Sequence, residues 1–443
     1  MVAPLAGSLQ KRIRKAEPMF ILSKRFFPFF NTFFWGALND NMFRNALVIM
    51  ITYQSGFSKG TASALSYLAM AALMLPQFPF SATAGEVADK YPQHKLFRWI
   101  KLAEVVLMLL TFCAFCFYAV PALCIPLLLV LLFFMGTQSA FYSPVKYAYI
   151  PRNLPEDLVR GNACVSAGTY LAILLGTILG NELITLPHGA YITGGLLVLV
   201  ALIGSFAARF IPELPSSQPD LRVNWNPVAG TTPIMKTIFR DYVLRHCVIG
   251  LSIFWMAGAL YVSQLAGFCK EVIGAKESLV MIFTLLFSVG VALGSCFCSL
   301  VRKRFNVIRL VPVALILMAG FTLDLYFASL SWTKQAAGQG ICELFFIPRF
   351  YRFVVDLILL AMCGGFYSVP LIALLQKTAK KEEMARIVAG NNIINAAMIG
   401  LGSVCSAALM FTGLISVEGI FVIVAAVNFA AAIYLMRLKK YRI

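Results

Sequence analysis

Long apolar runs recur from one end of the chain to the other, separated by short polar segments. Each run is about 20 residues or longer, the length that an α-helix needs to cross a bilayer. An all-α integral membrane protein is therefore expected. Twelve membrane-spanning helices are predicted, over residues 27–52, 61–88, 96–120, 124–149, 160–183, 189–211, 243–268, 278–301, 309–330, 353–376, 386–412 and 416–437.

The sixth and seventh runs are separated by a segment of different composition, "RFIPELPSSQPDLRVNWNPVAGTTPIMK". Its proline, serine and other polar residues are typical of a linker rather than of a membrane span. The chain is thus expected to fall into five parts. These are a basic N-terminus (1–26), a six-helix bundle (27–211), a linker (212–242), a second six-helix bundle (243–437) and a tail (438–443).

The two halves also resemble each other in sequence. "FYSPVKYAYIP" (141–151) corresponds to "FYSVPLIALLQ" (366–376), and Gly161-Asn162 corresponds to Gly390-Asn391 after a charged loop. Such a duplication of six-helix halves, related by an axis along the membrane normal, is typical of transporters that work by alternating access about a central cavity.

Charge adds the orientation, because the basic residues are confined to alternate loops. The net charge is +18, although 60% of the 443 residues are hydrophobic and only 13% are charged. Lys and Arg cluster before the first span and after the second, fourth, sixth, eighth, tenth and twelfth, while the other loops are nearly free of them. By the positive-inside rule both termini and the linker are expected in the cytoplasm. Topology explains the basicity, so nucleic acid is not an expected partner.

The eleven cysteines do not form a recognisable metal or disulfide pattern. The pairs Cys113/Cys116 and Cys296/Cys298 lie in apolar runs without neighbouring His or carboxylate ligands, which favours packing over metal binding. No metal site and no cofactor are expected.

The first span contains a pronounced polar stripe within "GALNDNMFRNALVIM" (36–50). Asp40 and Arg44 are spaced i,i+4 and share a helix face, with Asn41 and Asn45 on the adjacent strip. A charged residue at the bilayer centre costs about 2.5–3.5 kcal/mol on insertion scales, so the stripe should face a cavity or a partner helix. It could line a substrate site, or Asp40 and Arg44 could be a self-neutralising pair that holds neighbouring helices.

Other polar residues inside predicted spans are weaker candidates. Asn392 and Asn395 in the eleventh span and Gln264 in the seventh could line the cavity or serve helix packing. Lys101 and Glu104 in the third span form an i,i+3 pair that is expected to be structural.

The segment "GEVADKYPQHK" (85–95) resembles the signature of the major facilitator superfamily between its second and third helices. Gly85, Asp89, Lys90 and Lys95 fit the pattern, whereas Pro92 stands where glycine is usual. The resemblance implies the major facilitator fold, twelve transmembrane helices in two pseudo-symmetric six-helix bundles. It also implies a conformational latch, in which Asp89 meets the start of the eleventh helix and the basic residues bridge the halves, favouring the outward-open state.

Five further segments, in this order, resemble the bacterial lysophospholipid transporter family. They are "FNTFFWGALNDNMFRNALVI", "FPFSATAGEVADKY", "FRWIKLAEVVLMLL", "MGTQSAFYSPVKYAYIP" and "GNACVSAGTYLAILLGTILG". They are even more similar to its transporter domain as fused to 2-acyl-glycerophosphoethanolamine acyltransferase and acyl-ACP synthetase. The resemblance implies an inner-membrane flippase for lysophospholipid, chiefly lysophosphatidylethanolamine. Ser166 stands where that family has an acidic residue, which leaves the substrate more open.

The resemblance also suggests roles for the polar residues. Arg44 would bind the phosphodiester as a two-pronged donor, and Asp40 would hold the ethanolamine ammonium or a coupling cation. Lys146, in the family's Ser-Pro-x-Lys-Tyr motif, would be a second phosphate contact or a partner for Asp40; the alternative is a lysine that snorkels to the membrane edge. The full substrate-binding set is Asp40, Arg44, Asn41, Asn45, Lys146, Ser166, Asn392, Asn395 and Gln264.

Acyltransferase activity is not expected of this chain. That enzyme class needs a His and an Asp about five residues apart to activate a glycerol hydroxyl, and His94, His188 and His246 have no such Asp after them. A separate acyltransferase/acyl-ACP synthetase is the expected functional partner of a monomeric transporter. Two alternatives stay open: a major facilitator transporter of another amphiphile, drug or siderophore, and a non-transporting membrane receptor or scaffold.

Overall fold

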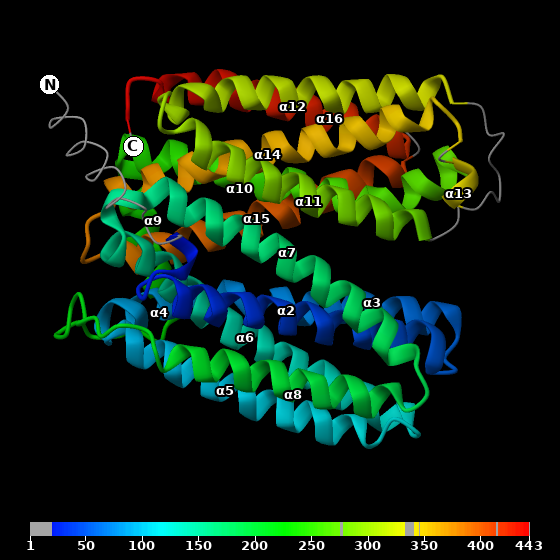
Figure 1. Ribbon diagram of the computed structural model, residues 1–443, viewed down its shortest axis with the longest axis horizontal. Helices are drawn as coiled ribbons and strands as arrows, with labels where there is room; N and C mark the ends of the chain where they lie inside the picture. Colours follow the sequence, from blue (N-terminus) through cyan, green and yellow to red (C-terminus); the bar gives the residue numbers. More distant parts are fainter. Residues whose placement is uncertain (1–19, 275–277, 333–340, 345, 413–414, 443) are drawn as a thin grey trace, which may run out of the picture.

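The computed structural model describes residues 20–274, 278–332, 341–344, 346–412 and 415–442, which contain helices and no β-strand. Two groups of long helices lie side by side (Figure 1). The first group comprises α2 (Phe27–Ile49), α3 (Lys59–Met74), α4 (Gln77–Lys90), α5 (Gln93–Phe115), α6 (Pro121–Asn153), α7 (Leu158–Thr185) and α8 (Gly189–Ala208). The second comprises α10 (Tyr242–Gly267), α11 (Ser278–Val301), α12 (Val307–Leu330), α14 (Phe350–Thr378), α15 (Met384–Phe411) and α16 (Val417–Leu435).

Shorter elements join these helices. The π-helical turns η2 (Met50–Gln54) and η4 (Phe268–Ile273) extend α2 and α10, and the 3-10 turns η1 (Phe20–Leu22), η3 (Pro155–Asp157) and η5 (Met436–Leu438) lie beside α2, α7 and α16. The linker between the halves contains one further helix, α9 (Pro227–Arg240). Between α12 and α14 the structure describes the short α13 (Ile341–Leu344), whereas residues 333–340 lie outside the described part of the chain.

Nine of the described helices are long and apolar enough to cross a membrane, beginning with Pro121–Asn153 and ending with Val417–Leu438. The helices before residue 121 are more polar or shorter, for identifiable reasons. α2 carries the Asn, Asp and Arg stripe, and α5 carries four Lys, Arg and Glu residues within its first half. The predicted span 61–88 is two helices, because the helical hydrogen bonds are interrupted at Leu75 and Pro76, where proline has no N–H to donate.

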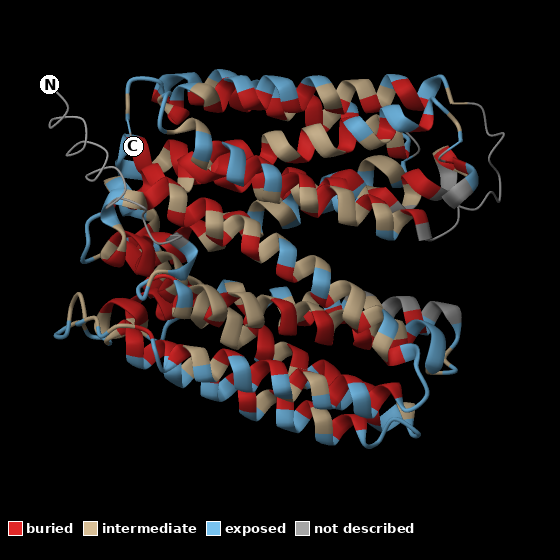
Figure 2. Cartoon of the chain, viewed as in Figure 1, coloured by how far each residue is buried: buried red, intermediate tan, exposed pale blue. Residues whose placement is uncertain are grey.

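The helices pack closely where small residues allow it. In α7, Gly176 and Gly180 lie against α2, and a Cβ built on them would be 2.4 Å from the carbonyl oxygens of Leu38 and Met42. Any larger side chain would push α2 and α7 apart, as at other small-xxx-small helix contacts in membranes. Buried residues lie mainly where helices face one another, while many positions on outer helices such as α8 and α12 are exposed (Figure 2). Those exposed positions include large apolar side chains such as Leu199, Phe206 and Leu330, as expected of surfaces that face lipid.

The two halves meet mainly at one end of the molecule. α4 packs extensively on α15, and α7 packs on α11 and α14. By contrast α3, which continues the α4 span toward the other end, packs chiefly on α2, η2 and α6 of its own half. We call the end that carries α4 and α9 the closed end and the opposite end the open end. In Figure 1 the closed end is on the left.

Candidate functional site

The two charged residues of the first span lie on α2 and are both half-buried. Within the described part of the chain, Asp40 and Arg44 form no salt bridge with each other or with another residue. One carboxylate oxygen of Asp40, Oδ1, is buried and has no hydrogen-bond partner there. The self-neutralising pair considered from the sequence is therefore not formed by direct contact. Both side chains keep hydrogen-bonding capacity for a ligand.

Asp40 lies within the electrostatic influence of residues from three helices. Besides Arg44 on α2, the charges of Lys101 and Glu104 on α5 and of Lys146 on α6 act on it. The Lys146 ammonium nitrogen lies 4.7 Å from the ring centroid of Tyr147 and 5.8 Å from that of Phe33. Lys146 is half-buried, so it is held among aromatic rings on the inner side of α6 rather than extended into bulk solvent.

A buried ion pair on α5 packs against α2. The Lys101 ammonium lies 2.6 Å from Glu104 Oε2, and both side chains are at most 2% exposed. Asn39 Nδ2 and Gln138 Nε2 also donate to the Glu104 carboxylate, at 3.3 and 3.2 Å. Gly36 makes room for this network, because a Cβ there would be 2.3 Å from Lys101 Nζ. The network joins α2, α5 and α6 beside Asp40, and its two buried charges compensate each other, while Asn39 Oδ1 has no partner among the described residues.

The two asparagines of the polar stripe, unlike Asp40, face α7. Asn45 donates to the carbonyl oxygen of Asn41 and to the hydroxyl of Thr177 on α7, at 2.7 and 3.1 Å. Asn41 donates to its own helix at Ala37 and lies beside Gly176 of α7. Both residues thus contribute to the α2–α7 contact. Their helical spacing in the sequence did not distinguish this packing role from cavity lining.

The remaining predicted substrate residues lie at contacts between helices. Two of these contacts join the halves: Asn392 donates to Ser143 Oγ at 2.8 Å, and Ser295 donates to Ser166 Oγ at 2.8 Å. Asn395 instead accepts from Ser252 within the second half, at 2.8 Å. Gln264 lies half-buried near the end of α10, toward the open end.

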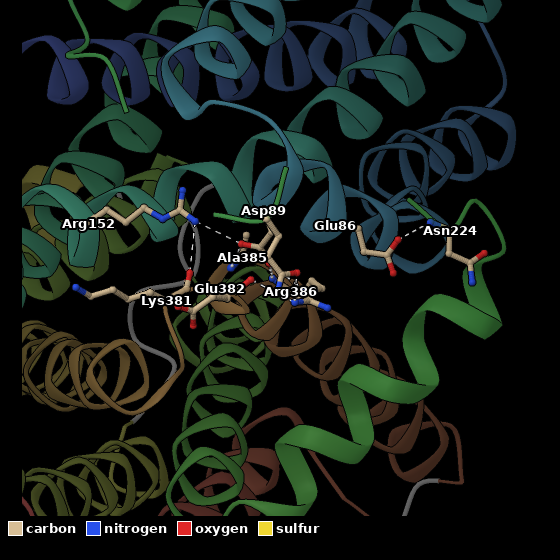
Figure 3. Close-up of polar contacts among 9 residues, drawn as sticks. Glu86, Asp89, Arg152, Asn224, Lys381, Glu382, Ala385 and Arg386 are labelled. Atoms are coloured by element: carbon tan, nitrogen blue, oxygen red, sulfur yellow. Dashed lines mark hydrogen bonds and ion pairs between the residues drawn. The ribbon is translucent and has the colours of Figure 1, made fainter. Parts of the chain in front are cut away.

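At the closed end Asp89 joins the last turn of α4 to the start of α15 (Figure 3). Its carboxylate accepts the backbone N–H groups of Ala385 and Arg386, at 3.2 and 3.3 Å. The Arg386 side chain also donates to it at 3.2 Å, and Arg152 from α6 lies at 3.7 Å. Asp89 is fully buried, so a negative charge at the positive end of α15 is sheltered and matched by two guanidinium groups.

The basic residues of the motif do not make this bridge. Lys90 lies over the ring of its neighbour Tyr91, at 5.7 Å, and Lys95 is exposed with no ion pair among the described residues. Gly85 has a direct steric role, because a Cβ on it would be 2.8 Å from Arg386 Cα. The cations that meet Asp89 come from distant parts of the sequence, so the motif's spacing carried no signal for them.

Further contacts that the sequence did not predict join the two halves. Gln376 on α14 accepts from Asn162 at 2.6 Å and donates to the carbonyl oxygen of Tyr147 at 2.9 Å. Arg302 pairs with Asp157 at 2.6 Å. A weak signal existed for Asn162 and Gln376, since both lie inside the repeated segments.

The linker is bonded to the same closed end. The Glu86 carboxylate accepts the backbone N–H of Asn224 at 2.5 Å (Figure 3). Thr83 donates to the Asn224 carbonyl oxygen at 3.0 Å. Gln218 of the linker accepts from Arg386 at 2.9 Å. The linker therefore holds α4 and α15 as well as connecting the two halves.

Comparison with known proteins accounts for this architecture. Residues 29–341, more than half of the chain, match the family model of the Major Facilitator Superfamily. The chain belongs to the major facilitator superfamily. Solved structures of this superfamily share its fold: the human organic anion transporter MFSD10 (TETRAN) has a TM-score of 0.68 at 14% identity, over 92% of this chain and 99% of that one. The transporter FucP in the outward conformation has a TM-score of 0.66 at 12% identity, over 94% and 98%.

Among curated members of the superfamily, this chain is similar to proteins named lysophospholipid transporter LplT. It is 27% identical to that of Enterobacter sp. over 358 residues, which is 80% of each chain. It is 26% identical to that of Yersinia enterocolitica over 392 residues, 87% of this chain and 84% of the relative. It is 24% identical to that of Serratia proteamaculans over 81% of each chain. The resemblance found from short segments is confirmed and extends into the second half.

Proposed function

We infer that this major facilitator protein transports lysophospholipids, chiefly lysophosphatidylethanolamine, across the bacterial inner membrane by alternating access. The observation that carries this proposal is its similarity, over about four-fifths of both chains, to relatives named lysophospholipid transporters. A shared fold alone would support many cargoes, since this superfamily includes transporters of different substances.

The polar residues on α2 and α6 suit the head group of such a lipid. Arg44 offers a planar guanidinium without a salt bridge in the described residues, and would bind the phosphodiester through two hydrogen bonds. Lys146 would add a second positive charge. Asp40, whose Oδ1 has no partner among the described residues, would hold the ethanolamine ammonium or a coupling cation. The single acyl chain would lie along apolar helix faces.

The packing of the halves supports an outward-facing state. In this proposal the closed end is cytoplasmic, as the positive-inside rule predicts from the basic loops beside it, and both termini lie there. Asp89, with Gly85, Arg152 and Arg386, forms the latch that keeps this end shut. Lys90 and Lys95 would act beside the latch, by adding positive charge to the surface of the closed end.

The physiological setting follows from the same proposal. Flipped lysophospholipid would be re-acylated by a separate acyltransferase/acyl-ACP synthetase, and the transporter would act as a monomer. The alternative cargo is another amphiphile, drug or siderophore. Ser166 is the reason for this alternative, because it stands where the lysophospholipid transporters are expected to have an acidic residue. Its hydroxyl accepts a hydrogen bond from Ser295.

The test uses the purified full-length protein in phospholipid vesicles. Fluorescent lysophosphatidylethanolamine is added outside, and its loss from the outer leaflet is followed by quenching with an impermeant reductant. Protein-containing vesicles should flip the lipid faster than empty vesicles, and unlabelled lysophosphatidylethanolamine should compete. Equal rates in both kinds of vesicle would overturn the lipid proposal, whereas uptake of an unrelated solute by the same vesicles would favour the alternative cargo.

A further inference from the structure

A polar cavity whose lining includes neither the α2 stripe nor Asp89 lies at the closed end. It measures about 160 Å³ and is lined from the first half by η3 and the first turn of α7. From the second half it is lined by Arg302, Phe305 and Asn306 between α11 and α12, and by Lys377 at the end of α14. It is large enough for several water molecules or for one head group of comparable size. Whatever fills it contacts both halves.

The donors in this cavity are incompletely used. Arg302 Nη2 pairs with Asp157 at 2.6 Å, but Arg302 Nε is buried and has no hydrogen-bond partner in the described part of the chain. Lys377 gives one hydrogen bond to the Arg442 carbonyl oxygen at 3.0 Å and has two further donors. A buried donor without a partner is unfavourable, so Arg302 calls for an acceptor at this position.

The charge and the apolar lining together specify the acceptor. Arg302 and Lys377 supply two positive charges, and the first turn of α7 adds the positive end of a helix dipole. Asp157, at the N-cap of α7, offsets the charge of Arg302, with which it pairs, and the remaining opposing charge on the rim is Glu156, which is exposed. Phe305 also lines the cavity and is 61% exposed, and Leu300, two residues before Arg302, is 72% exposed. A phosphate group fits the basic part, and an acyl chain can lie on the exposed apolar surface beside it.

We propose that this cavity binds the head group of an anionic membrane phospholipid, which bridges the two halves and stabilises the closed end. Basic pockets between membrane helices on the cytoplasmic side are suited to such head groups. The bound lipid would be a resident of the membrane rather than cargo, and the proposal does not depend on what the protein transports.

Native mass spectrometry of the full-length protein in detergent tests this. Phosphatidylglycerol and phosphatidylcholine with identical acyl chains are titrated separately, and the bound fraction is measured at each concentration. Phosphatidylglycerol should bind more tightly. R302Q and K377Q should each weaken its binding about fivefold, which is the loss expected for one basic contact near a membrane surface. Lys303 is exposed and does not line the cavity, so K303Q should change nothing.

Two acidic variants separate lipid binding from the ion pair itself. D157N removes the partner of Arg302 but keeps the guanidinium, so phosphatidylglycerol binding should be retained or strengthened. If D157N weakened it as R302Q does, the ion pair between the halves would be the cause and the lipid contact would be refuted. E156Q removes the opposing charge and should strengthen binding.

Inorganic phosphate distinguishes the two sources of the anion. If free phosphate displaced phosphatidylglycerol and stabilised the protein equally well against heat, the cavity would be a phosphate site and the lipid assignment would be wrong. Equal binding of phosphatidylglycerol and phosphatidylcholine by the unsubstituted protein would also overturn it.

Discussion

Arg386 binds Asp89 twice, through its backbone N–H at 3.3 Å and through its side-chain Nε at 3.2 Å, both to the same carboxylate oxygen. Asp89 lies on α4 and Arg386 on α15, so one residue pair joins the two halves of the transporter. Because the backbone N–H belongs to the first turn of α15, the carboxylate also caps that helix. Separation of the halves at this end must break all of these bonds together.

Replacement of Asp89 by asparagine should loosen the closed end without removing head-group affinity. Asparagine keeps one acceptor but loses the charge, and hydrogen bonds to charged groups contribute about 1.5–3 kcal/mol each. Amide hydrogen exchange at residues 385–388 should accelerate about tenfold to a hundredfold in D89N. D220N is the control, since Asp220 is an exposed linker residue. A large loss of lysophosphatidylethanolamine affinity in D89N would contradict a purely conformational role.

Gly85→Ala should open the same contact by a steric route. The added Cβ would lie 2.8 Å from Ala389 Cβ and from Arg386 Cα, neither of which can rotate away. Overpacking of this kind typically costs about 1–3 kcal/mol, and here it falls on the interface between the halves. Hydrogen exchange at the start of α15 should therefore rise in G85A while the unfolding temperature in detergent changes little.

Gly195→Ala is the matched control, because nothing lies within 4 Å of a Cβ at that helical glycine. The substitution should leave exchange at α15 unchanged and be neutral or slightly stabilising, as alanine is the better helix former. Unchanged exchange in G85A would show that α4 and α15 adjust without separating.

The long apolar runs and the repeat predicted an all-helical chain in two halves, because the bilayer sets the length of each span and the halves repeat it. The interruption at Pro76 divided one predicted span, and the proline itself was a visible signal for it in the sequence. The site was less predictable. Asn41 and Asp40 are adjacent in sequence, yet one faces α7 and the other lies near charges from α5 and α6. Likewise the latch cations are Arg152 and Arg386, which only tertiary packing brings to Asp89.

Arg44→Ala should abolish most of the lysophosphatidylethanolamine flipping that the protein adds to vesicles. Arg44→Lys keeps the positive charge but not the planar fork, so it should recover only part of the rate. Loss of one charge-assisted contact of about 1.5–3 kcal/mol corresponds to roughly a tenfold to hundredfold weaker head-group affinity. The measurement is the concentration dependence of flipping, with R240A as the control, since Arg240 is exposed on α9. Full activity of R44A would remove Arg44 from the proposed site.

Removing one charge of the Lys101–Glu104 pair should destabilise the protein more than removing both charges. Removing one partner of a buried ion pair costs about 3–5 kcal/mol, because the other charge is left uncompensated. Lys101→Met should therefore lower the unfolding free energy by roughly this amount, measured by denaturant titration in detergent. In the double variant K101M/E104Q no charge is stranded, and the glutamine oxygen can still accept from Asn39 or Gln138, so much of the loss should be recovered. A double variant as unstable as K101M alone would show that the lysine acts through other contacts of its ammonium, such as that with the Tyr142 ring at 5.2 Å, rather than by balancing the Glu104 charge.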